Sequence, residues 1–238
     1  MNYKIVNGEK IYSYRWVIMA LCVLAVIVVN GSTLIFAGLA LPLLSPAEAG
    51  GYGLTPQEFT ILNSCSYLTG FLFCLVTGTW ADRSGIKKVM IIGFAISLIG
   101  AILRCFTDSF MGFFLTSVVF GFGLAALNAN SAKMLRLWFP GNMVGLAMGI
   151  YICGATVGCA IAVPAASMFT SATPVFVGVA VLAAVNLLAW GLLYRKHPDN
   201  EHLVNEPVMK HLGVVCKSKN LWIACLVIGF IMAAGAVN

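Results

Sequence analysis

Charged residues are scarce in this sequence of 238 residues, because only 9% are Asp, Glu, Lys or Arg. A soluble globular protein usually has about 25% charged residues and roughly 45–50% apolar ones, whereas 61% of the residues here are hydrophobic. The shortage of charge excludes a soluble domain and predicts an integral membrane protein. The basic residues stand between apolar runs and form no patch interleaved with aromatic residues, so we expect no binding to nucleic acid.

Motifs for metal binding, redox chemistry and catalysis are also missing. The eight cysteines include no Cys-x-x-Cys pair, and most lie inside apolar runs, where free cysteine behaves as a small hydrophobe. There is no Gly-rich phosphate loop, His-Glu-x-x-His motif or serine nucleophile elbow. Three histidines, His197, His202 and His211, share one polar segment at spacings that suit no standard metal site. We therefore expect no enzyme, no metal and no cofactor.

Six apolar runs are long enough to cross the ~30 Å hydrocarbon core as helices that rise ~1.5 Å per residue. The first is longer than the core of a signal peptide and is expected to be retained. Residues 1–15 form a short polar segment, 16–194 the six-helix domain, 195–220 a polar linker, and 221–238 the beginning of a seventh helix. The predicted spans cover about residues 16–41, 59–81, 89–103, 110–132, 144–168 and 175–194.

The ends of the first two spans carry recognisable signals. Pro42 and Pro46 are expected to stop the first span. Thr55, Pro56 and Glu58 then fit an N-cap, a first-turn proline and an acidic residue near the positive end of a helix.

The distribution of positive charge predicts the orientation. If the connections alternate between two sides, thirteen of the fourteen Lys and Arg residues fall on one side, and only Arg104 falls on the other. Cytoplasmic loops of membrane proteins are enriched in these residues. We therefore expect a multi-pass protein of the plasma or inner membrane with a cytoplasmic N-terminus.

The polar hinge of residues 78–88 joins the second and third spans. Gly78 permits close approach of a neighbouring helix, Asp82 can accept hydrogen bonds, and Gly85 suits a tight turn. Alone, this pattern also fits a solvated turn with basic residues on the cytoplasmic face. Gly78, Asp82, Arg83, Gly85 and Lys87 together resemble the signature loop between the second and third helices of the major facilitator superfamily.

That resemblance implies a role for the hinge. In the family, the matching Asp and Arg help to latch the N-terminal half of the transporter against its C-terminal half on the cytoplasmic side. The resemblance assigns this latch to Asp82 and Arg83, with Gly78 as the contact point and Lys87 as part of the basic pair. One position departs from the pattern, since Ile86 stands where the family usually has a basic residue.

Small residues recur in the fifth span. Gly145, Gly149, Gly154 and Gly158 form two Gly-x-x-x-Gly pairs that point roughly to opposite faces of a helix, which predicts a helix packed between others. The spacing resembles the glycine skeleton of an antiporter motif in the family. The Gly-Pro and Gly-Gly that complete that motif are missing, so close packing is the preferred interpretation.

The junction before the fifth span carries a second resemblance. Trp138, Phe139 and Pro140, followed by residues 145–149, resemble the junction of the fourth and fifth helices in the oxalate/formate, monocarboxylate and nitrate/nitrite porter branches. An aromatic pair at the membrane interface and a helix-starting proline would explain the same letters. Cys74 stands where nitrate porters place an arginine, which disfavours a nitrate-type site.

Uncharged polar residues are the candidates for a substrate path, because no span carries Asp, Glu, Lys, Arg or His in its interior. Interhelical hydrogen bonds would equally satisfy each of them. As a set they fit a path near the midplane, where transporter sites lie. They are Asn30, Ser32, Thr33, Asn63, Tyr67, Asn128, Asn130, Tyr151 and Thr156.

The sequence as a whole predicts an all-α integral membrane protein that resembles the N-terminal half of a major facilitator. It would have six transmembrane helices in two inverted three-helix repeats, with part of a seventh. The implied function is transport of a small solute, most simply a small organic anion, by alternating access. Its partners would be the lipid bilayer, the solute and a C-terminal half. A proton-coupled exporter of drug-like or sugar-like solutes and a non-transporting scaffold or receptor remain alternatives.

Overall fold

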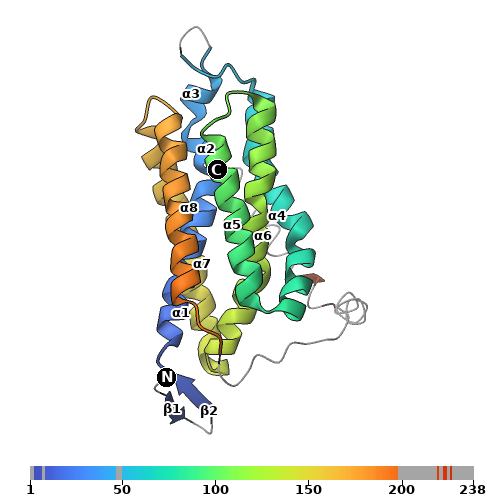
Figure 1. The fold of residues 1–238 in the computed structure, drawn as a ribbon, viewed down its shortest axis with the longest axis vertical. Helices are drawn as coiled ribbons and strands as arrows, with labels where there is room; N and C mark the ends of the chain where they lie inside the picture. Colours follow the sequence, from blue (N-terminus) through green and yellow to red (C-terminus); the bar gives the residue numbers. More distant parts are fainter. Residues whose placement is uncertain are drawn as a thin grey trace. The chain divides into compact units, whose positions relative to one another are not determined.

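Long helices make up most of the computed structural model, which describes residues 3–6, 9–46 and 50–197, together with residues 219, 222, 223 and 226. Within those residues, six helices are long and apolar enough to cross a membrane. Figure 1 shows them as α1 (Arg15–Thr33), α4 (Pro56–Ser84), α5 (Ile86–Arg104), α6 (Phe110–Trp138), α7 (Val144–Ser167) and α8 (Thr173–Leu193).

Shorter elements accompany the long helices. An antiparallel hairpin of β1 (Tyr3–Val6) and β2 (Glu9–Tyr12) precedes α1, and the sequence did not predict it. Two short helices, α2 (Ile35–Gly38) and α3 (Ala40–Leu44), follow α1, and a 3-10 turn, η2 (Gly141–Met143), leads into α7.

The six predicted spans match the six long helices, which confirms the all-helical fold. By contacts between residues, the chain divides into a unit of residues 1–202, which holds all six, and a second unit of residues 203–238. The predicted linker and seventh helix fall mostly outside the described residues. Beyond residue 197 the structure describes Lys219, Trp222, Ile223 and Leu226, and each of them is helical.

The first predicted span is not one continuous helix. Leu34 and Leu39 leave the helical conformation, with φ/ψ of −87°/5° and −98°/19°. Just before the first break, Thr33 Oγ1 donates to the Val29 carbonyl oxygen at 2.7 Å, a side-chain bond that competes with the regular ladder. Pro42, which has no N–H to give the Gly38 carbonyl, lies inside α3 and does not end it.

The hinge prediction was wrong about the backbone. Helix α4 does not end at Ala81 but continues through Asp82 and Arg83 to Ser84. Gly85 alone separates α4 from α5, with a φ of +87° that residues with a Cβ rarely adopt. Asp82 and Arg83 therefore occupy the last turn of a helix. The polar residues mark the end of the apolar part of the sequence, but the helix continues beyond it.

The main helix contacts follow a two-fold pattern. Helix α4 packs along α6 and α1 along α7; α5 contacts α6 and α8, α1 also contacts α8, and α1 meets α6. Exchanging α1 with α6, α4 with α7 and α5 with α8 leaves this set of contacts unchanged. Each exchange pairs helices that run in opposite directions (Figure 1). This is the arrangement expected of two inverted three-helix repeats.

Helix α6 begins with a side-chain cap. Ser109 Oγ accepts a hydrogen bond from the backbone N–H of Gly112 at 3.2 Å, which satisfies one of the free donors of the first turn. We expect Ser109→Ala to cost ~1 kcal/mol of stability and to lower the midpoint of thermal unfolding of the purified protein. Ser171→Ala, at an exposed residue before α8, is the matched control and should leave the midpoint unchanged.

Candidate functional site

An ion pair joins α4 to α6 near the Gly85 break. Lys133 Nζ lies 2.7 Å from Asp82 Oδ1, and the same nitrogen donates to the Gly78 carbonyl oxygen at 3.3 Å. The Asp82 side chain is 28% exposed and that of Lys133 41%. The ammonium group thus lies at the carbonyl end of α4, where a helix favours positive charge.

Sequence reasoning missed Lys133 as a partner of Asp82. It placed the end of the fourth span at Ala132 and treated Lys133 only as a loop charge. In the structure α6 continues for six residues beyond Ala132, so Lys133 remains helical and faces α4. The separation of 51 residues between the two partners leaves no local signal. Only the side-by-side packing of α4 and α6 brings them together.

The other hinge residues divide into two groups. Lys87 Nζ donates to the carbonyl oxygen of Tyr194, the C-cap of α8, at 3.1 Å. A Cβ at Gly78 would lie 3.6 Å from the Ala129 Cβ, an ordinary contact with α6. Arg83 is exposed. Asp82 and Lys87 thus bind groups within the six-helix unit, whereas Arg83 points to its surface.

The nine candidate substrate-path residues differ in exposure. Ser32, Thr33, Asn130 and Tyr151 are buried, and Asn30 and Asn63 are half-buried. Tyr67, Asn128 and Thr156, on α4, α6 and α7, are exposed.

Most of the amides and hydroxyls among the nine donate a hydrogen bond within their own helix. Five of them, Asn30, Thr33, Asn63, Asn130 and Thr156, donate to the carbonyl oxygen four residues earlier. No hydrogen bond links two of the nine in the described part of the chain. The Oδ1 atoms of Asn63 and Asn130 are buried without a hydrogen-bond partner there.

Two of the buried polar residues that escaped the sequence search carry unpaired polar atoms. Asn186 lies in α8 with 2% of its surface exposed and an unpaired Oδ1; an amide in the middle of an apolar run was a signal that could have identified it. Arg104, which was assigned to an outer turn, is the last residue of α5 and is fully buried. Its burial depends on α2 and α6, so the local sequence gives no sign of it.

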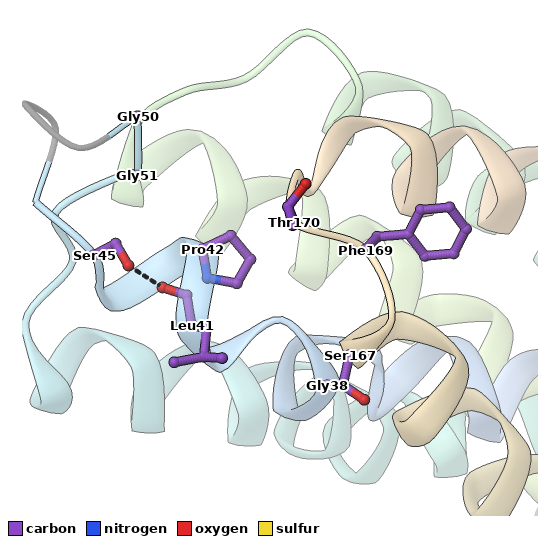
Figure 2. A pocket seen from close by; sticks show the side chains of 9 residues that line it. All are labelled: Gly38, Leu41, Pro42, Ser45, Gly50, Gly51, Ser167, Phe169 and Thr170. Carbon is purple, nitrogen blue, oxygen red and sulfur yellow. Dashed lines mark hydrogen bonds between the residues drawn. The ribbon is translucent and has the colours of Figure 1, made fainter.

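A pocket of about 220 Å³ lies where α2 and α3 approach the end of α7. Figure 2 shows that much of its lining is backbone and small side chains, and that Ser45 donates its hydroxyl to the Leu41 carbonyl oxygen, at 2.6 Å. None of its lining residues is ionisable, and none is a candidate substrate-path residue. They are Gly38, Leu41, Pro42, Ser45, Gly50, Gly51, Ser167, Phe169 and Thr170.

The predicted packing glycines of α7 also divide into two pairs. A Cβ at Gly158 would lie 2.6 Å from the Ile27 carbonyl oxygen of α1, and one at Gly154 would lie 3.1 Å from Val26. Gly145 and Gly149 have no atom within 4 Å of the position of a Cβ. The face of α7 that carries Gly154 and Gly158 thus packs closely on α1, whereas a Cβ at Gly145 or Gly149 would contact no other helix among the described residues of this unit.

Comparison with known proteins places these features in context. Residues 21–238 match the family described as Major Facilitator Superfamily. Over 166 residues, or 68% of this chain, the sequence is 26% identical to the probable L-galactonate transporter of Escherichia coli K12 and 27% identical to the probable sulfoacetate transporter SauU of Cupriavidus necator. These alignments cover 37% and 38% of the two relatives.

Solved structures share the fold. The peptide transporter POT in complex with sulfate is similar over 99% of this chain and 48% of its own, with a TM-score of 0.69 and 16% identity. A POT family transporter in complex with 5-aminolevulinic acid gives a TM-score of 0.63 at 14% identity over 93% of this chain and 47% of its own. The chain thus spans about half the length of the solved transporters it resembles.

Proposed function

The chain belongs to the Major Facilitator Superfamily, and from this premise we propose that it forms one half of a secondary transporter for a small organic anion. The relatives at 26% and 27% identity are named for L-galactonate and sulfoacetate, which are both small organic anions. This shared substrate class is the observation that carries the proposal. The resemblance of the 138–149 junction to anion porter branches points the same way.

The charge pattern of the helices supports an anionic solute. Glu58 and Asp82 are the only acidic residues of the six long helices, and they lie in the first and last turns of α4. A cationic solute would therefore find no carboxylate near the middle of this half. An anion meets no repulsion there, and its own charge could couple its movement to the membrane potential.

The exposed polar residues are the proposed substrate contacts. Transporter sites lie near the bilayer midplane between the two repeats or halves, so a side chain that contacts the solute should be exposed when one half is viewed alone. Tyr67, Asn128 and Thr156 meet this condition, whereas Ser32, Thr33 and Asn130 are buried within the half. We assign the buried residues to helix packing.

The hinge is the proposed cytoplasmic latch, in which Asp82 and Arg83 have different roles. Asp82 pairs with Lys133 and so fixes the end of α4 to α6. Arg83 is exposed one residue later and is the group that would reach the other half of the transporter. This assignment places the N-terminus and the hinge on the cytoplasmic side, as the distribution of thirteen Lys and Arg residues predicts.

Uptake of radiolabelled solutes into proteoliposomes tests the function. We expect the full-length gene product to take up a small carboxylate or sulfonate, such as galactonate or sulfoacetate, in a saturable manner. Matched peptides and sugars without charge should not be taken up. Flux no greater than in empty vesicles for every anion would contradict the proposal and favour a non-transporting scaffold.

Asn128 and Asn130 provide a matched pair for the substrate path. We expect Asn128→Ala to raise the KM for the transported anion about tenfold, since a hydrogen bond to a charged group is worth ~1.5–3 kcal/mol. Asn130→Ala removes a buried amide that donates to the Ala126 carbonyl oxygen at 2.8 Å, so it should lower the yield of folded protein and leave KM unchanged. Equal effects of the two changes on KM would contradict the assignment.

A further inference from the structure

Arg104 holds its guanidinium group between two aromatic rings. It is the last residue of α5 and has 0% of its surface exposed. The guanidinium carbon lies 4.8 Å from the centre of the Phe36 ring on α2 and 4.7 Å from that of Phe120 on α6. Nη2 donates to Ser117 Oγ at 3.1 Å. Two aromatic rings thus lie against the cation, and one of its N–H groups is paired.

Two of the three guanidinium nitrogens have no protein acceptor among the described residues. Nε and Nη1 of Arg104 are both buried without a hydrogen-bond partner among the described residues. No carboxylate pairs with this side chain there either. A guanidinium has five N–H donors, and a buried charge is costly unless it is both paired and hydrogen-bonded. Cation–π contacts with the two rings offset part of the cost of burying the charge, but they leave Nε and Nη1 without an acceptor.

The other cations near helix ends differ from Arg104 in burial or in their partners. Arg15, the first residue of α1, also lies near two rings, Trp16 and Phe139, and its Nε and Nη1 also lack a partner among the described residues, but the residue is only half-buried. Lys133 has Asp82 and a carbonyl oxygen, and Lys87 has the Tyr194 carbonyl oxygen. Among the Lys and Arg residues whose exposure the structure gives, Arg104 is the one that is buried as a whole residue. It is also the one basic residue that the sequence assigns to the outer side. A cation that is fully buried, and that lies on the side with few basic residues, needs an acceptor to offset the cost of removing its charge from water.

We propose that Arg104 is the binding site of a small anion, a halide or the carboxylate of a solute, which accepts hydrogen bonds from the unpaired donors of the guanidinium group, Nε–H or Nη1–H. A planar guanidinium matches a carboxylate or a small spherical anion better than any neutral acceptor. The full burial of the group limits the ligand to one that fits between α2, α5 and α6.

Access to the site requires movement of α2. This helix has four residues and is bounded on both sides by the non-helical Leu34 and Leu39. Phe36, which covers one face of Arg104, belongs to it. A displacement of α2 about these two residues would uncover the guanidinium, and it would also separate the Phe36 ring from Phe113 of α6 and Phe176 of α8. The site is therefore closed in this conformation, and the anion enters when α2 moves.

Thermal unfolding of the purified full-length protein tests the site. The probes are sodium chloride, sodium acetate and sodium HEPES at equal ionic strength, the last having an anion too large for the site. We expect chloride or acetate to raise the unfolding midpoint saturably, as a ligand of the folded state must, and HEPES to do so only weakly and without saturation. Arg104→Gln should abolish the saturable rise, whereas Arg136→Gln, an exposed change on α6, should retain it.

The following results would overturn the proposal of an anion site at Arg104. A saturable rise that persists in Arg104→Gln, or a wild-type protein that responds to chloride and acetate only as it does to HEPES, would overturn the proposal. If Arg104→Gln does not fold, broadening of the ³⁵Cl resonance by the wild-type protein, and its reversal by acetate, replaces the variant; no saturable broadening would likewise overturn it.

The two ligand sources and the two proposals can be separated. Binding of chloride alone indicates a resident inorganic ion, whereas competition by the transported carboxylate indicates a substrate site. The inference rests on the proposed function only in its choice of carboxylates, and binding is read without transport. A protein that binds the anion but takes up no solute overturns the proposed function alone, and saturable uptake without such binding overturns the site alone.

Discussion

Replacing Gly158 by leucine will leave little folded protein in the membrane. A Cβ at this position would lie 2.6 Å from the Ile27 carbonyl oxygen and 2.8 Å from the Ile27 Cα. Both atoms belong to the backbone of α1, so no side-chain rotation can relieve the contact. Gly31 of α1 approaches the same place, since its own Cβ would lie 3.0 Å from the Gly158 carbonyl oxygen. A leucine would force the two helices apart along their whole contact.

The matched control for this prediction is on the same helix. Gly158→Ala should destabilise the protein by ~1–3 kcal/mol, the usual cost of overpacking. Gly149→Ala should be neutral or slightly stabilising, because nothing lies within 4 Å of its Cβ and alanine favours helix over glycine. The measurement is the monodisperse fraction of a fluorescent fusion in size-exclusion chromatography, followed by thermal unfolding. Equal yields of Gly158→Leu and wild-type protein would show that α1 and α7 are not this close.

Reversing the charge at Asp82 will lower uptake of the transported solute at least ~10-fold, and reversing Lys133 in the same chain will restore most of it. Asp82→Lys places two ammonium groups where the 2.7 Å ion pair now lies and leaves Lys133 with only the Gly78 carbonyl oxygen. The end of α4 would then separate from α6, and Arg83 would move with it. Asp82→Lys with Lys133→Asp re-forms a pair of opposite charges at the same place.

Stability measurements distinguish this effect from misfolding. A partly exposed ion pair contributes only ~0–1 kcal/mol, so the unfolding midpoint of Asp82→Lys should change little while uptake falls. Arg136→Glu, an equal charge reversal at an exposed residue of α6, is the control and should keep normal uptake. If Asp82→Lys transported as the wild type does, the proposed latch would lose its support.

The six spans could be predicted because each depends on local composition and length. The N-cap of α4 was equally accessible: Thr55 Oγ1 accepts from the Glu58 N–H at 3.3 Å, and the Thr55 N–H donates to Glu58 Oε2 at 2.8 Å. Both features need only a few consecutive residues. The breaks at Leu34 and Leu39 were not predicted. The residues around Leu39 are as apolar as those of a continuous helix, and the polar residues just before Leu34 were assigned to a substrate path and not to a break.

Helix ends were predicted less well than helices. The sequence placed the ends of α4 and α6 where polar residues begin, at Ala81 and Ala132, but both helices continue for several residues. Hydropathy marks where the apolar layer ends, whereas a helix ends where its backbone hydrogen bonds do. Asp82 and Lys133 lie in these two extensions. The hinge motif that contains Asp82 could be recognised from consecutive residues, whereas its partner Lys133 was assigned to a loop.

Burial separated the candidate residues in a way that no sequence pattern could. Asn128 and Asn130 are two positions apart on α6, yet one is exposed and the other has 0% of its surface exposed. Arg104 shows the same limit, because its two aromatic neighbours come from α2 and α6. Residue type identified which side chains were polar, and only the packing of distant helices decided which of them are exposed.

The single glycine between α4 and α5 has a consequence for biosynthesis. A connection of one residue, Gly85, cannot span any distance, so the two helices have to turn back on each other as soon as both have emerged from the ribosome. They should therefore enter the bilayer together as a hairpin rather than one after the other. Lengthening this connection by even a few residues would uncouple the two insertion events, although every contact of the finished fold could still be made.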